Sequence, residues 1–168
     1  LDYLPGSIAY QPARPRGVDG ALASAIVWFD AFIMNVDRTA KNPNLLVWHD
    51  KLWMIDHGAA LYVHHAWNDP DRVAISRFGM IKDHVLLPHA DDIAGAAERM
   101  TSEITDRLID DVLAIIPDEW LAGESTPFQS PGDHRDAYRR FLTMRRDASA
   151  GFADEAISAR SAQLAGAR

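Results

Sequence analysis

The hydrophobic residues of this chain recur mostly at the three- and four-residue intervals of α-helices. Residues 19–34 are apolar on almost every side, which predicts a buried helix with Asp19 as its N-cap. Residues 91–116 carry one apolar stripe with charges opposite and predict a second, amphipathic helix. That stripe comprises Ile93, Ala97, Met100, Ile104, Leu108 and Val112. Pro117 predicts the first turn of a short helix, and residues 133–165 predict a last long helix rich in Arg and Ala.

A β-hairpin is predicted after the first helix. Residues 44–48 (NLLVW) and 52–56 (LWMID) are short apolar runs on either side of a turn at residues 49–51 (HDK). Residues 1–18 hold three prolines and two glycines, which predict an extended lead-in with a short strand at residues 1–4.

The segments after the hairpin are less regular. Residues 59–72 predict a strand end and an irregular loop, and residues 72–90 predict a short helix and a loop that ends near Pro88. The sum is an α+β chain that is mostly α, in which a polar loop lies between a buried helix and a small hairpin. We therefore divide the chain into a lead-in, residues 1–18, and one helical lobe, residues 19–168.

Composition and charge exclude several classes of protein. At 168 residues, with 48% hydrophobic and 24% charged residues, the chain fits one globular domain or one large lobe. No apolar run reaches the ~20 residues that cross a bilayer, and no signal peptide is evident, so we expect a cytoplasmic protein. The net charge of −7 disfavours nucleic acid as a partner, and the absence of Cys excludes disulfides and thiolate metal sites.

The densest group of polar residues lies in and around residues 35–43. Asp37 and Asn42 are five residues apart, and Asp56 ends the second strand of the hairpin. Because a hairpin returns the end of its second strand to the start of its first, Asp56 should lie beside Asn42. Mg²⁺ prefers a few oxygen ligands completed by water and substrate phosphates, so Asn42 and Asp56 suit this metal. Asp37 is then free to accept a proton from a substrate hydroxyl.

Kinases divide the work of phosphoryl transfer in this way, with the motif order D-x-x-x-x-N and then D-x-G. This chain has Asp37-Arg-Thr-Ala-Lys-Asn42, followed by Asp56-His-Gly58. Each half is a weak signal, because Asp and Asn also cap turns by hydrogen bonding to the nearby backbone. The ordered combination of buried helix, polar loop, hairpin and D-x-G favours the catalytic interpretation.

The run WFDAFIMNVDRTAKNPNLLVWHDKLWMIDHGAALYVHH resembles the catalytic core of HipA-like kinases, and more narrowly a solitary bacterial branch of that family. The related phosphatidylinositol kinases have the same motif order, with D-R-H-x-x-N followed by I-D-F-G. The resemblance is specific over residues 1–67 and implies a protein-kinase-like large, C-terminal lobe that uses ATP and Mg²⁺. It implies that Asp37 is the catalytic aspartate and that Asn42 and Asp56 are the magnesium ligands.

Several positions depart from the kinase pattern. His57 stands where protein kinases have Phe, and Thr39 stands where many kinases have His or Lys. Lys41 precedes Asn42 and is a candidate contact for the γ-phosphate of ATP. The 36 residues before Asp37 contain no Lys and no G-x-G-x-x-G. A kinase needs such a lysine and loop to grip the nucleotide, so we expect this chain to lack its partner, an N-terminal lobe, and to be an incomplete enzyme alone: a partial sequence or, as the less favoured alternative, half of a split enzyme.

The remaining polar and aromatic residues receive mainly structural interpretations. Arg38 is expected to brace the polar loop through an ion pair, and Asn44 to fix its backbone. His64 and His65 follow the D-x-G segment and are possible substrate contacts. Three further histidines are predicted to be solvated or locally bonded: His84, His89 and His134. Three tryptophans are predicted to lie in the core: Trp28, Trp48 and Trp53.

These observations favour the C-terminal catalytic lobe of an ATP- and Mg²⁺-dependent kinase whose acceptor is a hydroxyl, most simply that of Ser or Thr in a protein. Two alternatives stay open. One is a non-catalytic, kinase-derived binding module, which the missing lobe favours, and the other is a phosphoinositide-type lipid kinase. Residues 62–90 and 122–133 are expected to select the acceptor, but they carry no motif that identifies it.

Overall fold

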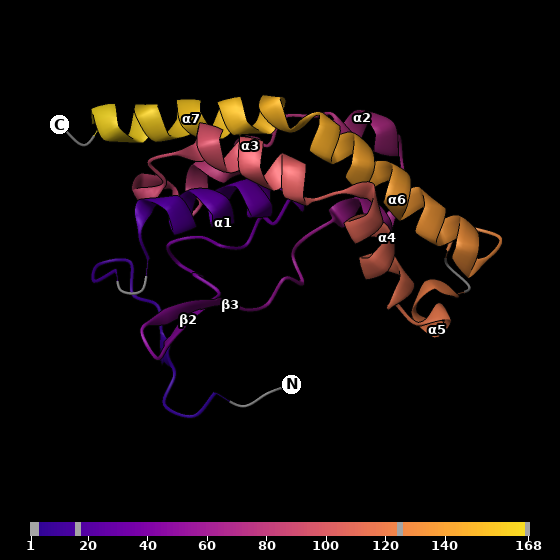
Figure 1. Ribbon diagram of the computed structural model, residues 1–168, viewed down its shortest axis with the longest axis horizontal. Coiled ribbons are helices and arrows are strands. Elements are labelled where there is room, and N and C mark those ends of the chain that lie inside the picture. Colours follow the sequence, from indigo (N-terminus) through magenta and orange to yellow (C-terminus); the bar gives the residue numbers. More distant parts are fainter. Residues whose placement is uncertain (1–3, 16–17, 124–125, 167–168) are drawn as a thin grey trace.

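The computed structural model describes residues 4–15, 18–123 and 126–166 of the chain. The fold is α+β and mostly helical, as the sequence predicted (Figure 1). The helices are α1 (Gly20–Phe32), α2 (Pro70–Ala74), α3 (Ile93–Glu103), α4 (Asp106–Ala114), α5 (Asp118–Leu121), α6 (Pro131–Asp147) and α7 (Ser149–Gly166). The strands are β1 (Ile8–Ala9), β2 (Leu45–Trp48) and β3 (Lys51–Met54), and short 3₁₀ turns lie at Tyr62–His65, Gly79–Asp83 and Leu87–His89.

The core forms where α1, α3 and α7 pack against one another, and the hairpin of β2 and β3 lies on the other side of α1 (Figure 1). Trp28 of α1 is fully buried and packs against two phenylalanines, with ring centroids 5.4 Å from Phe32 and 5.6 Å from Phe152 of α7. α1 begins at the predicted cap, because the Asp19 carboxylate accepts a hydrogen bond of 2.7 Å from the backbone N–H of Leu22. The first helix is therefore buried as its all-round apolar sequence predicted.

The small sheet is antiparallel and has the order β1-β2-β3. The hairpin was predicted, but its turn is two residues long, His49 and Asp50, since Lys51 already pairs with Trp48. Both turn residues have positive φ, as a tight hairpin turn that matches the strand twist requires. The predicted strand at residues 1–4 lies largely outside the described residues, and β1 instead forms at Ile8–Ala9 within the lead-in.

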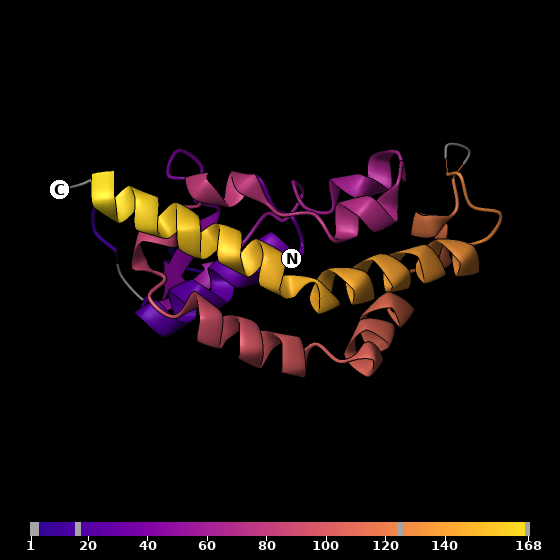
Figure 2. The ribbon, with the colours of Figure 1, turned by 90° about the horizontal axis from the view of Figure 1, so that it is seen from above.

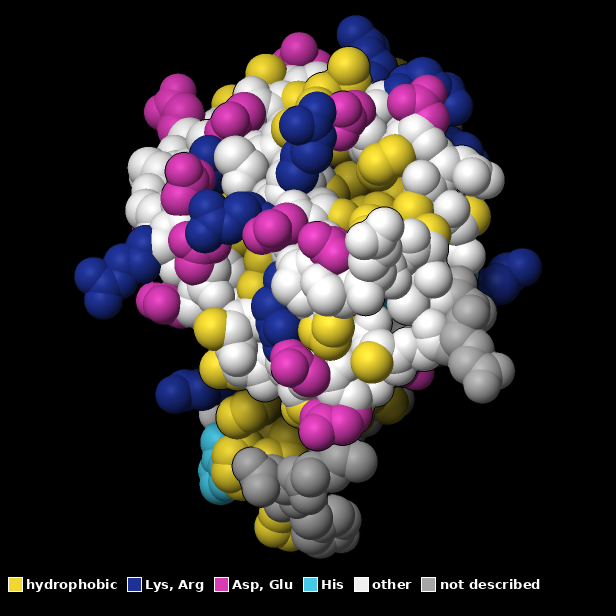
Figure 3. Space-filling model, turned by 90° about the vertical axis from the view of Figure 1, so that its right-hand side faces the viewer, with side chains coloured by type: hydrophobic (Ala, Val, Ile, Leu, Met, Phe, Trp, Pro, Cys, Tyr) yellow, Lys and Arg dark blue, Asp and Glu magenta, His cyan; other side chains and the backbone are white. Residues whose placement is uncertain are grey.

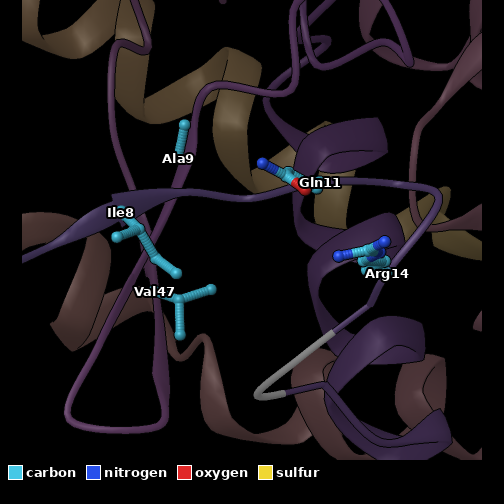
Figure 4. Close-up of a pocket in the computed structure, with 5 residues that line it drawn as sticks. All are labelled: Ile8, Ala9, Gln11, Arg14 and Val47. Carbon is cyan, nitrogen blue, oxygen red and sulfur yellow. The ribbon is translucent and has the colours of Figure 1, made fainter.

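A shallow recess accompanies the pairing of β1 with β2 (Figure 4). It is lined by Ile8, Ala9, Gln11, Arg14 and Val47. Ile8 pairs with Val47 in the sheet register, so the strand pairing brings these two lining residues together.

The prediction of one helix over residues 91–116 was wrong, because α3 ends at Glu103 and a separate helix, α4, begins at Asp106. Thr105 starts the next helix, and its hydroxyl accepts a hydrogen bond of 3.2 Å from the backbone N–H of Leu108. The break rotates the apolar stripe, so that α4 buries Ile109 and Leu113 while Leu108 is 44% exposed. The N-cap at Thr105 thus starts a new helix where the apolar periodicity predicted a continuous one.

The predicted helix over residues 133–165 is also two helices, α6 and α7, which meet at Ala148 and run along the length of the molecule (Figure 2). Arg145 anchors the end of α6, because its buried guanidinium donates to the backbone carbonyls of Ala31, Phe32, Ala74 and Ser76. Ser149 bonds to Thr101 of α3 at 3.0 Å and directs α7 onto the core. These anchors fix the two helices in different directions.

The prediction that three tryptophans lie in the core holds for Trp28 and fails for Trp53, which is 40% exposed on β3. Trp48 is half-buried and donates a hydrogen bond of 3.0 Å to the carbonyl of Pro5. Alternate residues of a hairpin point to opposite faces, and only one face of this sheet meets the helices.

Basic and acidic side chains are interspersed over the face of the molecule that includes α4, α5 and the start of α6 (Figure 3). Several of them form ion pairs, for example Arg146 with Asp106 at 2.6 Å and Arg140 with Asp71 at 2.5 Å. None of the helices in the described part of the chain has both the length and the apolar character of a membrane-spanning segment.

Candidate active site

The polar loop that carries Asp37 is held between α1 and the segment that follows β3. Its first residues bond to that segment, since the N–H of Leu61 donates to Ile33 O at 2.8 Å and the N–H of Val36 donates to Ala59 O at 3.2 Å. Its last residue bonds to the end of the hairpin, where the N–H of Ile55 donates to Asn44 O at 3.0 Å. The loop and the D-x-G segment are therefore neighbours, as the hairpin predicted.

The side chain of Asp37 is oriented by two amides. Nδ2 of Asn42 donates to Oδ2 of Asp37 at 2.7 Å, and Nδ2 of Asn44 donates to the same oxygen at 3.2 Å. Oδ1 of Asp37 has no hydrogen-bond partner among the described residues. The amide of Asn42 uses its nitrogen for Asp37, which leaves its oxygen available to a cation. One oxygen of Asp37 is thus fixed and the other is free to accept a hydrogen bond.

Asp56 lies just beyond β3, exposed and with a positive φ of 49°. Its Oδ1 accepts a hydrogen bond of 3.2 Å from the N–H of Gly58, which forms a local turn. No hydrogen bond joins the Asp56 carboxylate to Asp37 or Asn42 within the described ranges; the connection runs through the backbone pair of Asn44 and Ile55. The structure therefore brings Asp37 and Asn42 into direct contact and Asp56 to the adjoining segment.

Arg38 braces the polar loop through an ion pair, as predicted. It is 1% exposed, and its Nε donates to Oδ2 of Asp30 at 2.5 Å. Its Nη1 donates to the carbonyl of Asn44 and, at 3.4 Å, to that of Ile55. Its Nη2 lies 3.0 Å from Nε2 of His57. One guanidinium therefore ties α1 to the polar loop, to the end of the hairpin and to the D-x-G segment.

His57, the residue that replaces Phe of D-F-G, is held as a neutral hydrogen-bond acceptor. Burial lowers the pKa of His57, and the charge of Arg38 lowers it further, against the opposing effect of Asp30 and Asp56. Because Arg38 has only donors, the ring nitrogen that faces it must be unprotonated. The ring also meets Phe29 of α1 edge to face, with centroids 6.4 Å apart.

Three residues of the site were missed by the sequence reasoning: Asp30, His84 and Asn35, the last of which is buried and bonds to Asp30 and to the N–H of Asp37. Asp30 of α1 is fully buried and was not singled out, although it is the one charged residue in a mostly apolar helix. His84 was predicted to be solvated or locally bonded, yet it is 5% exposed and its Nε2 lies 2.9 Å from Oδ2 of Asp30. The isolated charge in α1 was a signal for the first residue, whereas the second comes from 54 positions away in the chain.

The other candidate residues lie around this centre. Lys41 is exposed beside Asn42. His64 is half-buried and lines a mainly apolar groove with Phe29, His57 and Leu61. Burial lowers the pKa of His64, and the neighbouring His65 lowers it further. His134 was predicted to be solvated or locally bonded; it is 9% exposed, and its Nδ1 lies 3.1 Å from the carbonyl of Leu121.

The donor chemistry fits magnesium better than a metal held by the protein alone. Across residues 4–15, 18–123 and 126–166, no three His, Cys, Asp or Glu side chains gather as a metal site. The available donors are the amide oxygen of Asn42 and the carboxylate of Asp56. An incomplete oxygen set of this kind suits Mg²⁺, which keeps several waters and is completed by substrate phosphates.

A buried helix, a loop with Asp37 and Asn42 in contact, and a hairpin that leads to Asp56-x-Gly58 are typical of a kinase catalytic core. The family model described as HipA-like kinase matches residues 5–149, and the chain therefore belongs to the HipA-like kinase family. Membership of this family indicates a kinase. No individual curated protein and no solved structure matches the chain.

Proposed function

We propose that residues 19–168 form the C-terminal catalytic lobe of a kinase that transfers the γ-phosphate of ATP to a hydroxyl, with Ser or Thr of a protein as the acceptor. The observation that carries this proposal is the hydrogen bond of 2.7 Å between Asn42 and Asp37, because it leaves one oxygen of each side chain free. Those two oxygens serve different partners, a hydroxyl and a cation. Membership of the HipA-like kinase family supports the reaction class.

Asp37 has the role of orienting the acceptor hydroxyl. Its free Oδ1 accepts the hydroxyl proton as the new O–P bond forms and the bond between the γ-phosphorus and the leaving oxygen of ADP breaks. Asn42 and Asn44 hold the other oxygen, so the carboxylate cannot rotate away. Positioning of this kind is a main source of catalysis in phosphoryl transfer.

Asn42 and Asp56 are the residues that would hold Mg²⁺. When bound, the metal neutralises charge on the β- and γ-phosphates of ATP. Asp56 offers the oxygen that Gly58 does not occupy, and Asn42 offers its amide oxygen. Lys41, exposed beside Asn42, is proposed to contact the γ-phosphate. We assign gripping of the α- and β-phosphates to an N-terminal lobe, with residues 1–18 as the segment between the two lobes.

The proposal is tested with substitutions in the intact protein. Asp37→Ala should lower phosphate transfer from radiolabelled ATP by ~10²–10⁴-fold, the usual contribution of a positioned general base. It should leave the dissociation constant for MgATP nearly unchanged. Asp56→Ala and Asn42→Ala should weaken nucleotide binding in the presence of Mg²⁺ and leave metal-free binding unchanged, as isothermal titration calorimetry with and without MgCl₂ would show.

Asp111→Ala is the matched control, because this exposed carboxylate on α4 takes part only in a long ion pair of 3.7 Å with Arg107. Its transfer rate should equal that of the wild type. Casein and phosphatidylinositol vesicles as acceptors distinguish a protein kinase from a lipid kinase. A wild-type protein that binds MgATP but transfers phosphate to neither acceptor, nor to itself, would overturn the proposal in favour of a non-catalytic binding module.

A further inference from the structure

We infer that Asp30 of α1 is the positioning residue of this site, and that it orients the catalytic loop through three buried hydrogen-bond donors. The inference rests on the proposed function, since the loop that Asp30 holds contains the proposed catalytic residue Asp37. Asp30 does not touch substrate. Its contribution is the geometry of the residues that do.

The Asp30 carboxylate is the centre of a buried polar network. Its Oδ1 accepts a hydrogen bond of 3.0 Å from Nδ2 of Asn35, and its Oδ2 accepts one of 2.5 Å from Nε of Arg38. Nε2 of His84 lies 2.9 Å from Oδ2. His84 is the donor in this pair, because its Nδ1 accepts the backbone N–H of Leu86 at 3.1 Å.

Each of the three donors leads to a different part of the site. Oδ1 of Asn35 accepts the backbone N–H of Asp37 at 3.2 Å, so Asn35 connects Asp30 to the catalytic residue itself. Arg38 connects Asp30 to the carbonyls of Asn44 and Ile55 and to His57. A single side chain therefore links the Asp30 carboxylate to each end of the loop: Asn35 links it to the N–H of Asp37, and Arg38 links it to the carbonyl of Asn44.

His84 contributes a segment that is remote in the sequence. It forms an isolated β-bridge with Thr39, and the N–H of the next residue, Val85, donates to the carbonyl of Arg38 at 2.9 Å. The backbone of the loop is thus held on one side by residues 84 and 85 and on the other by residues 55 and 59. Asp30 bonds to the first support directly through His84, and it is linked to the second through Arg38, which donates to the carbonyl of Ile55.

The chemistry of the network argues for orientation. Burial raises the pKa of Asp30, but hydrogen bonds from His84 and Arg38 outweigh that effect and keep the pKa below its usual range. A buried ionic network contributes little net stability compared with a well-packed apolar replacement. Such a network differs from apolar packing in that its hydrogen bonds are directional, because every donor must face the carboxylate at hydrogen-bond distance. The required orientation of these donors fixes the backbone path of residues 35–44.

The test uses three variants of the intact protein. Asp30→Asn preserves the shape of the side chain and replaces one acceptor oxygen with a donor. His84→Ala removes one support, and His84→Gln restores a donor. Arg135→Met is the matched control, since it removes a largely buried arginine that donates to the carbonyls of Leu113 and Ile116 and pairs with Asp118, far along the chain from the loop.

Two readouts separate positioning from general destabilisation. Amide hydrogen exchange of peptides spanning residues 35–44 should accelerate by ~10-fold or more in Asp30→Asn and His84→Ala, because local opening then costs less. Turnover per folded molecule, counted by the stoichiometry of MgATP binding, should fall by ~10–100-fold with the MgATP dissociation constant unchanged. His84→Gln should recover most of both losses. Arg135→Met should change neither readout.

The inference fails if Asp30→Asn stays folded and retains wild-type exchange and turnover, or if Arg135→Met alters residues 35–44 equally. Should Asp30→Asn fail to fold, the comparison of His84→Ala with His84→Gln still decides the matter. The proposed function can fail separately: a wild-type protein without transfer activity, combined with accelerated exchange in the variants, would refute the kinase role and leave the positioning role of Asp30 intact.

Discussion

Arg145 provides the strongest test of how this fold is held together. Its side chain is fully buried, and it donates to carbonyls at the C-terminal end of α1, Ala31 O at 2.7 Å and Phe32 O at 3.2 Å. It also donates to carbonyls at and just beyond the end of α2, Ala74 O at 3.1 Å and Ser76 O at 2.5 Å. The last carbonyls of a helix lack partners within the helix and carry the negative end of its dipole. One cation therefore caps two helices.

The expected loss in Arg145→Met follows from these contacts. A hydrogen bond to a charged group contributes about 1.5–3 kcal/mol, and four of them are lost. The cost of burying the guanidinium, several kcal/mol, disappears at the same time. Burial lowers the pKa of Arg145 to about 10, so the side chain is still charged at neutral pH and that cost is real. We expect a net loss of about 3–5 kcal/mol, a large share of the ~5–15 kcal/mol typical of a domain.

Urea unfolding followed by circular dichroism measures this loss. With a slope of about 2 kcal/mol per M, the midpoint should fall by about 1.5–2.5 M. Arg145→Lys should lose less, because it keeps the charge and part of the bonding. Arg107→Met, at a side chain 90% exposed, should change stability by no more than about 0.5 kcal/mol. A loss below about 1 kcal/mol in Arg145→Met would refute the double-cap argument.

Three further predictions concern single residues. The stability that neutral His57 provides should be complete above about pH 6.5 and decline as the pH falls, because its folded pKa is depressed and the unfolded chain takes up the proton first. His57→Phe should flatten this decline in urea titrations at pH 7.5 and 5.5, and equal pH dependence in both proteins would contradict it. Asp50→Gly should raise the free energy of unfolding by about 0.5–1 kcal/mol, because glycine adopts the φ of 57° in the hairpin turn without strain. The measurement is the midpoint of thermal unfolding, which should rise. Trp28→Ala should cost about 3–5 kcal/mol in the same assay, whereas Trp120→Ala, 78% exposed, should stay within about 0.5 kcal/mol.

The sequence predicted those parts of the fold that depend on neighbouring residues. The buried α1 and the hairpin of β2 and β3 follow from periodicity and turn chemistry, and both form where expected. The contact between Asp37 and Asn42 was also within reach, because both belong to one short loop. These features need information from no more than about twenty consecutive positions.

The features that could not be predicted depend on contacts between distant segments. The break at Ala148 follows from the anchoring of Arg145 on α1 and α2, and no local pattern announces it. His84 reads as an ordinary surface histidine until Asp30 is known to lie beside it. The break before Thr105 is different, since its cap was visible in the sequence and the continuous apolar stripe concealed it.

The long span of the contacts to α1 has a consequence for the order in which the protein is completed. A nascent chain that has reached residue 60 already contains Asp37, Asn42 and Asp56, but the partner of Asp30 at residue 84 and the partner of Ala31 at residue 145 have not been synthesised. Such non-local contacts form late, because closing a long stretch of chain costs entropy before the contact repays it. The residues proposed for catalysis are therefore made before the residues that hold their loop and α1 in place, and a partial chain released before residue 145 would carry the whole motif without those contacts.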